Sequence, residues 1–188
     1  MIHLAIFASG NGTNAERIMN EFEVDQEITV SAVFSNRADA YVLKRAENFG
    51  VPTEVFDRSQ FSNPGFSRRL DNHQVDFIVL AGFLWKIPEH LIRAFPNKIL
   101  NIHPALLPSY GGKGMYGERV HQAVLMNNEQ KSGITIHLVN ENYDEGRILF
   151  QAECEVANDT VMSLAEKIHR LEHLHFPRVI RNYVMRSS

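Results

Sequence analysis

The chain has 188 residues, of which 44% are hydrophobic and 22% are charged, and it carries a formal net charge of −3 at pH 7. This composition is ordinary for a folded globular protein and argues against a disordered, collagen-like or coiled-coil chain. The charge gives no reason to expect a nucleic-acid partner. With Cys154 as its one cysteine, the chain has no internal disulfide and no cysteine-based zinc site.

The length and the apolar runs also limit how the chain is organised. A chain of 188 residues is expected to form one domain, residues 1–188. No apolar run approaches the roughly 18–20 residues of a membrane span, so no membrane partner is expected. The first apolar run lacks the preceding basic residues of a signal peptide, and a cytoplasmic location is therefore the expectation.

Apolar runs alternate with helical patterns through the first part of the chain. The sequence predicts strands over 3–9, 28–35, 53–56, 76–82 and 98–103. It predicts helices between them at about 14–22, 38–49, 64–73 and 88–95. Alternating strands and helices are typical of βαβ units with right-handed crossovers, which form a parallel sheet.

The pattern changes in the last third of the chain. Strands are predicted over 132–139 and 147–156, on either side of a turn-rich segment, and they are candidates for antiparallel pairing. A final helix is predicted to about Val184, with a cap from Thr160 and Ser163 and a kink at Pro177. The expected fold is a single α/β domain: a mostly parallel, Rossmann-like twisted sheet with helices on both faces and late antiparallel strands.

The first strand ends in a loop of small polar residues, Ser-Gly-Asn-Gly-Thr-Asn at 9–14. Gly10 and Gly12 allow close approach and positive φ, and Thr13 and Asn14 supply polar groups at the start of a helix, where an anion is favoured. The loop lacks the Lys-Ser/Thr ending of a P-loop, and Ala15 stands where G-x-G-x-x-G needs its third glycine. The loop therefore indicates a nucleotide-like phosphate site, with a ligand-free tight turn as the alternative.

A second group of polar residues follows the strand over 98–103. Asn101 and His103 are two residues apart and so lie on the same face, at the end of the strand where open α/β sheets bind ligands. Asp144 lies in a later loop; if that loop folds back, its carboxylate raises the pKa of His103 or holds a water. An amide, an imidazole and a carboxylate together suit acyl transfer to an amine. The alternative is that His103 caps the strand and Asn101 supports a turn.

Six motifs in order carry a resemblance that covers nearly the whole chain. They are FASGNGTN, AVFSNRADA, VLAGFLWKIP, ILNIHPALLP, HLVNENYDEGRILFQ and EHLHFPRVI. With them the chain resembles the phosphoribosylglycinamide formyltransferases, also called glycinamide ribonucleotide transformylases. The resemblance implies transfer of a formyl group from the co-substrate 10-formyltetrahydrofolate to the amine of glycinamide ribonucleotide in purine biosynthesis. It implies direct attack by the amine, no metal, and a monomer or homodimer.

The resemblance also assigns roles to residues. It places the substrate phosphate on Gly12, Thr13 and Asn14 and the ribose hydroxyls on Glu172. It implies that Asn101 and protonated His103 stabilise the oxyanion and that Asp144 manages the amine proton. The residues implied for the folate are Leu84, Trp85, Lys86, Ile87, Val139 and Asn140. The N-terminal half is thus expected to bind the phosphate and the C-terminal half the folate.

Other functions remain open from the sequence. A formyltetrahydrofolate deformylase-like hydrolase shares these motifs but carries an N-terminal regulatory domain, and methionyl-tRNA formyltransferase lacks the glycine-rich phosphate loop. A binding protein without catalysis would not need Asn101, His103 and Asp144 together. His169 and His173 flank Glu172 in an H-x-x-E-H pattern, which also occurs in zinc hydrolases.

Three features depart from the expected pattern or stay unassigned. The segment Gly111–Gly117 is longer and richer in glycine than the family segment, and Lys113 and Tyr116 within it are candidates for ligand contact. The family often has arginine where Trp85 stands. His121 is either a ligand contact or a helix-surface histidine, and His137 is expected to support the catalytic loop or to pack beneath it.

Overall fold

The computed structural model describes residues 1–187 and forms one seven-stranded sheet in the order β3-β2-β1-β4-β5-β6-β7. The strands are β1 (Ile2–Phe7), β2 (Ile28–Ser35), β3 (Thr53–Val55), β4 (Phe77–Leu80), β5 (Ile99–His103), β6 (Lys131–Leu138) and β7 (Ile148–Glu155). The first five strands pair in parallel, whereas β6 pairs antiparallel with β5 and with β7. The predicted sheet, with its late antiparallel strands, is confirmed.

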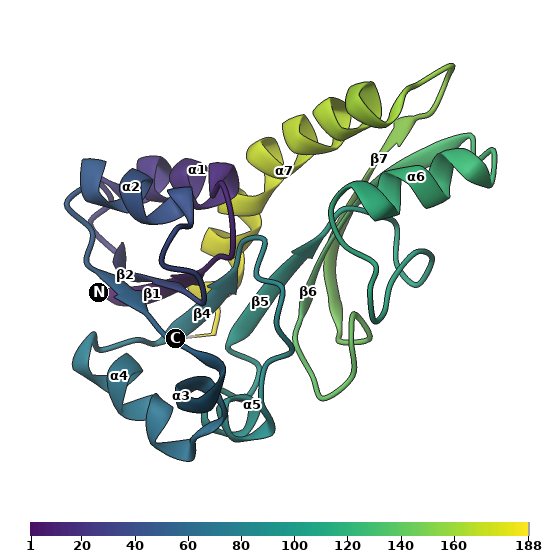
Figure 1. Cartoon of the computed structure of the whole chain (residues 1–188). Helices are drawn as coiled ribbons and strands as arrows, with labels where there is room; N and C mark the ends of the chain where they lie inside the picture. The colour runs from purple at the N-terminus through teal and green to yellow at the C-terminus, as the bar shows by residue number, and fades with distance from the viewer. Residues whose placement is uncertain (188) are drawn as a thin grey trace.

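Helices cover both faces of the sheet. They are α1 (Thr13–Phe22), α2 (Tyr41–Asn48), α3 (Arg58–Ser62), the 3-10 turn η1 (Pro64–Phe66), α4 (Ser67–Asn72), α5 (Glu89–Ala94), α6 (Glu118–Met126) and α7 (Val161–Val184). Figure 1 shows α1, α2, α6 and α7 above the sheet and α3, α4 and α5 below it. Because both faces are covered, a central strand such as β4 is apolar and buried at every position.

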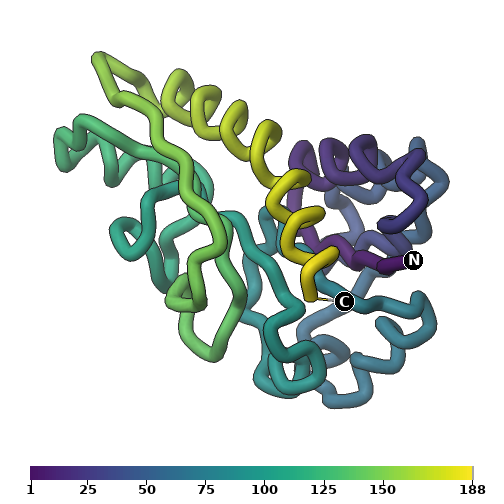
Figure 2. The backbone as a smooth tube through the Cα atoms, turned by 180° about the vertical axis from the view of Figure 1, so that it is seen from behind, coloured from purple at the N-terminus to yellow at the C-terminus, as the bar shows by residue number. Residues whose placement is uncertain are grey.

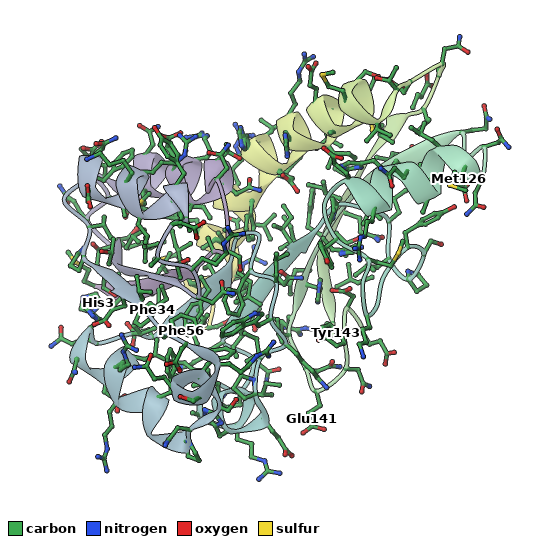
Figure 3. All side chains as sticks on the ribbon, in the orientation of Figure 1. His3, Phe34, Phe56, Met126, Glu141 and Tyr143 are labelled. Atoms are coloured by element: carbon green, nitrogen blue, oxygen red, sulfur yellow. The ribbon has the colours of Figure 1, made fainter. Side chains whose placement is uncertain are left out.

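Each face has its own hydrophobic core. The core under α1, α2, α6 and α7 contains Leu4, Ile6 and Phe176, and the core against α3–α5 contains Phe7, Phe34 and Phe56. The rings of Phe7 and Phe34 stack with centroids 4.9 Å apart. Figure 3 shows Phe34 and Phe56 inside the molecule, whereas Met126 projects from the end of α6.

Two helices were not predicted, and one predicted helix is divided. The segment 64–73 forms η1 followed by α4 rather than one helix, because Pro64 begins a tight turn capped by Asn63. The short α3 was missed although Asp57 and Gln60 form a capping box at its start. The start of α6 has no side-chain cap and follows Gly117, so the usual start signal is absent there.

The last helix, α7, packs on β5, β6 and β7 and against α1 and α6. Thr160 accepts a hydrogen bond from the Ser163 amide, and Ser163 Oγ accepts one from the Thr160 amide, which confirms the predicted cap. The helix continues through Pro177, and Figure 2 shows that its axis changes direction along its length. Among residues 1–187, no helix combines the length and the apolar character needed to cross a membrane.

Candidate active site

A cavity of about 710 Å³ lies at the carboxyl ends of the strands, where the loops after β1, β4, β5 and β6 meet α7. This is the position that ligands occupy in open α/β sheets. All thirteen site residues predicted from the sequence line it: Gly12, Thr13, Asn14, Leu84, Trp85, Lys86, Ile87, Asn101, His103, Val139, Asn140, Asp144 and Glu172. The chain therefore brings the predicted phosphate, catalytic and folate segments to one place.

The loop after β1 is shaped around Gly12, which caps the N-terminus of α1. Gly12 has φ 77° and ψ 29°, a left-handed conformation. A Cβ atom built at Gly12 would lie 2.4 Å from Cγ2 of Val42, so α2 leaves no room for a side chain. The loop consequently runs tight against α2 and delivers Thr13 and Asn14 to the first turn of α1, where unpaired backbone N–H groups favour an anion.

Asn14 and Glu172 form a buried pair on one side of the cavity. Asn14 Nδ2 donates a 2.8 Å hydrogen bond to Glu172 Oε2, and Asn14 Oδ1 is buried without a partner. Glu172 is 6% exposed, and burial raises the pKa of its carboxyl group although the hydrogen bond from Asn14 opposes this. The pair presents both an amide and a carboxyl group to a bound ligand.

The H-x-x-E-H pattern does not form a metal centre in the described part of the chain. The rings of His169 and His173 lie nearly parallel with centroids 6.3 Å apart, while Glu172 between them is bonded to Asn14. Within residues 1–187, no group of three histidine, cysteine or acidic residues is arranged to hold a metal ion. The zinc-hydrolase alternative thus finds no ligand set here.

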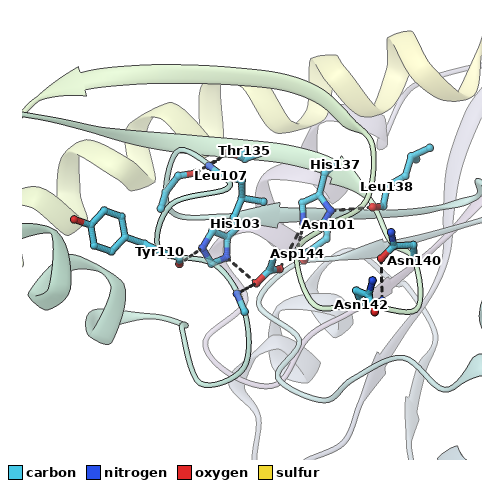
Figure 4. A network of polar contacts seen from close by, with 12 residues as sticks. Asn101, His103, Leu107, Tyr110, Thr135, His137, Leu138, Asn140, Asn142 and Asp144 are labelled. Carbon is cyan, nitrogen blue, oxygen red and sulfur yellow. Dashed lines mark hydrogen bonds and ion pairs between the residues drawn. The ribbon is translucent and has the colours of Figure 1, made fainter.

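Asn101 is oriented by a histidine from the neighbouring strand. β5 and β6 pair so that Asn101 stands opposite His137. His137 Nδ1 is 2.8 Å from the Leu138 carbonyl oxygen, which can only accept, so the proton is assigned to Nδ1. His137 Nε2 then accepts from Asn101 Nδ2 at 3.1 Å (Figure 4). One amide hydrogen of Asn101 is held in this way, and the other is left for a ligand.

His103 lies between a carbonyl oxygen and a carboxylate. Its Nε2 donates to the Tyr110 carbonyl oxygen at 2.8 Å, and its Nδ1 lies 3.7 Å from Asp144 Oδ2 (Figure 4). Asp144 Oδ2 also accepts from the Gly112 amide at 2.9 Å. Asp144 Oδ1 is 3.6 Å from His137 Nε2. The loop after β6 therefore folds back onto β5, as the sequence analysis supposed.

Burial and charge act in opposite directions on His103. Burial lowers the pKa of His103, whereas the Asp144 charge and the Tyr110 carbonyl raise it, and the pKa lies below its usual value. Asp144 therefore raises the pKa of His103, as expected from the sequence, but the effect of burial is larger. Burial raises the pKa of Asp144, but the charge of His103 and the hydrogen bond from the Gly112 amide lower it, and its pKa lies below the usual value. The site thus favours a neutral His103 beside an ionised Asp144, in place of the protonated His103 that the resemblance implied.

The predicted folate segment is tied to the phosphate loop. The Leu84 amide donates to Ser9 Oγ at 3.0 Å, which joins the loops after β4 and β1. The Trp85 ring packs against α3, where the Arg58 guanidinium lies 4.2 Å from its centroid. Lys86 Nζ lies 5.5 Å from the ring centroid of Tyr143, so this segment meets the loop that carries Asp144.

Residues that the sequence left unassigned also line the cavity. His121 is 4% exposed on α6 and lines the cavity, so it is not a helix-surface histidine. Burial, with the charge of His169, lowers the pKa of His121 to about 4. Gly112–Gly117 line the same cavity, including Lys113 and Tyr116. The sequence spacing does not show that these residues reach the site, because their position depends on how α6 packs on α7.

Comparison with known proteins agrees with this geometry. The sequence model described as "Formyl transferase" matches residues 2–180. The chain is 42% identical over 187 residues to "Phosphoribosylglycinamide formyltransferase, chloroplastic" of Arabidopsis thaliana, covering 94% of this chain but only 63% of that protein. It is 34% identical over 188 residues to "Phosphoribosylglycinamide formyltransferase" of Bacillus subtilis, covering 96% of this chain and 94% of that protein.

A solved structure has the same fold. The structure titled glycinamide ribonucleotide transformylase 1 from Symbiobacterium toebii superposes with a TM-score of 0.88 at 34% identity, covering 96% of this chain and 86% of that one.

Proposed function

Because the chain belongs to the formyl transferase family and, within it, to the phosphoribosylglycinamide formyltransferases, we propose that it transfers a formyl group from 10-formyltetrahydrofolate to the amine of glycinamide ribonucleotide. One observation carries the proposal: a phosphate loop and the triad of Asn101, His103 and Asp144 line one cavity. Such a cavity holds a phosphorylated acceptor beside groups suited to acyl transfer.

The two substrates divide the cavity between them. Gly12, Thr13 and Asn14 hold the phosphate at the N-terminus of α1, and Glu172 binds the ribose hydroxyls. Backbone groups from Leu84 to Ile87 face the pteridine, and Val139 and Asn140 close the other side. In the proposed arrangement the folate lies between loops from both halves of the chain, because 84–87 and 139–140 line the cavity together.

The amine nitrogen attacks the formyl carbon, a C–N bond forms, and the carbonyl electron pair moves to oxygen. The free amide hydrogen of Asn101 stabilises this oxyanion. His103 Nδ1 takes the proton that the attacking amine loses, and the resulting imidazolium is stabilised by Asp144 and the Tyr110 carbonyl. When the bond to the folate nitrogen breaks, the imidazolium returns its proton to that nitrogen.

A deformylase-like hydrolysis of the formyl donor is the alternative reaction, and the phosphate loop with Glu172 favours the ribonucleotide as acceptor. A spectrophotometric assay decides between them by following release of tetrahydrofolate with and without glycinamide ribonucleotide. Turnover that requires both substrates is expected. Turnover without the ribonucleotide would establish the hydrolase instead, and no turnover by folded protein would contradict both. We also propose a cytoplasmic location, although the Arabidopsis relative is named as chloroplastic.

A further inference from the structure

Arg45 on α2 forms hydrogen bonds with the loop that precedes α1. Its Nε donates to the Asn11 carbonyl oxygen at 2.8 Å, and its Nη2 donates to Asn11 Oδ1 at 3.1 Å. Its Nη1 donates to Glu16 Oε2 on α1 at 2.5 Å. The Arg45 side chain is 18% exposed, whereas its partner Glu16 is 41% exposed and Asn11 lies at the surface. Asn11 lines the cavity, but Arg45 does not.

The rest of α2 holds the same loop from behind. The Val42 amide donates to the Gly10 carbonyl oxygen at 3.1 Å, and Gly12 lies directly against Val42. The carbonyl oxygens of Gly10 and Asn11 therefore face α2. Because these carbonyl groups point away from the cavity, a phosphate in the loop does not meet their negative ends.

Arg45 also compensates a charge that would oppose phosphate binding. Glu16 lies in the first turn of α1, close to the helix N-terminus. An ionised carboxylate near that N-terminus repels a phosphate, and a paired guanidinium offsets part of this repulsion. One side chain therefore fixes the loop and neutralises its nearest acid.

We propose that Arg45 is a positioning residue that sets the affinity for the ribonucleotide phosphate through Asn11 and Glu16 without touching the substrate. This inference rests on the proposed function, since it assumes that loop 9–14 holds a phosphate. It predicts an effect on one substrate only. The formyl donor lies on segments that Arg45 does not contact.

The test compares Arg45→Met with Lys44→Met, an exposed neighbour on α2 that pairs with Glu47. Calorimetric titration should show that R45M weakens ribonucleotide binding at least about tenfold, because charge-assisted hydrogen bonds to the loop are lost. The KM for the ribonucleotide should rise in parallel, while kcat and the affinity for the formyl donor change by no more than about twofold. K44M should match the wild type in all of these values.

Two further variants separate the contributions of Arg45. Arg45→Lys keeps the charge beside Glu16 but loses the paired hydrogen bonds to Asn11. Its loss of ribonucleotide affinity should therefore be smaller than that of R45M. Adding Glu16→Gln to R45M should recover part of the affinity by removing the unpaired carboxylate. Melting curves check that each variant is folded, and if R45M is unfolded, R45K takes its place in the comparison.

Several results would overturn the inference. One is an R45M variant that binds the ribonucleotide as the wild type does, and another is an equal loss of affinity for both substrates, which would indicate general damage. Titration with inorganic phosphate separates this inference from the proposed function. Wild-type protein that binds phosphate but not the ribonucleotide refutes the function, while a loss of phosphate affinity in R45M still supports the positioning role. Wild-type protein that binds neither refutes both.

Discussion

Asn14 at the start of α1 and Glu172 in α7 are 158 positions apart in the chain, and a 2.8 Å hydrogen bond joins their side chains inside the cavity. The contact ties the phosphate loop to the last helix. It also leaves Glu172 buried, with its pKa raised because burial disfavours the ionised form. If Glu172 served packing alone, the protein would be more stable with a neutral side chain at this position. This gives a first prediction.

Glu172→Gln should stabilise the fold at neutral pH. It should also weaken ribonucleotide binding by about tenfold or more, because an amide binds ribose hydroxyls less strongly than a carboxylate does. Since the folded pKa lies above the unfolded value near 4.5, the wild type loses stability as pH rises above that value. Thermal melts should therefore show an advantage for E172Q at pH 7 that disappears toward about pH 4.

Glu166→Gln, an exposed substitution on the same helix, is the matched control and should change neither quantity. A melting temperature of E172Q below that of the wild type at pH 7 would show that the carboxylate contributes to stability. Unchanged ribonucleotide affinity would remove Glu172 from the binding site.

Asp144→Asn should lower kcat by about 100-fold or more, because the imidazolium that forms on His103 loses its countercharge. The variant should stay folded, since an asparagine tolerates the left-handed φ of 56° found at Asp144 and its side-chain oxygen can still accept from Gly112. Steady-state kinetics and a melting curve measure both effects. Glu141→Gln in the same loop is the control, because Glu141 points into solvent (Figure 3). Near-normal turnover of D144N would exclude Asp144 from the mechanism.

Much of the fold could be predicted because strands and helices follow local rules. Alternating apolar runs indicated the parallel strands, and the Thr160–Ser163 cap marked the start of α7. The helix α6 escaped prediction because Gly117 precedes it without a capping side chain. A missing start signal therefore explains why α6 was not predicted, but not why α3 was not, since α3 begins with a capping box.

The candidate site was predicted in part for a similar reason. Asn101 and His103 share a face because strands have a period of two, which the sequence displays directly. The hydrogen bond between Asn101 and His137 depends on the register of β5 with β6, and the grip of Arg45 on Asn11 depends on how α2 packs. Such contacts arise from tertiary packing, and one sequence shows no pattern that pairs them.

The acid limb of the pH–rate profile should have its midpoint below 6.5, the ordinary pKa of histidine. The proposed mechanism needs neutral His103, and burial lowers the pKa of that imidazole, so activity should persist below the usual histidine value. The Asp144 charge raises the pKa of His103. In D144N the pKa of His103 should therefore fall further.

Titration of the His103 Cε1 proton by NMR measures the same group without turnover. Its resonance is assigned by its disappearance in His103→Gln. A midpoint at or above 6.5 in the wild-type protein would contradict the neutral imidazole. A pKa that is unchanged in D144N would show that the two side chains are not coupled at their separation of 3.7 Å.

Gly12→Ala should destabilise the protein, because Gly12 combines φ 77° with a contact that brings a new Cβ atom within 2.4 Å of Val42. Left-handed strain and overpacking together cost about 2–4 kcal/mol, measured as the change in the free energy of unfolding in urea. Ribonucleotide affinity should fall as well, since α2 and the loop must move apart to admit the methyl group.

Gly10→Ala is the matched control two residues earlier in the same loop. A Cβ atom at Gly10 meets nothing within 4 Å, so its effect on the unfolding free energy should stay within about 0.5 kcal/mol. Equal free energies of unfolding for the two alanine variants would mean that the loop moves at Gly12 without destabilising the protein. In that case the close packing of the loop on α2 would not hold it in its phosphate-binding form, and the role assigned to Arg45 would lose its structural basis.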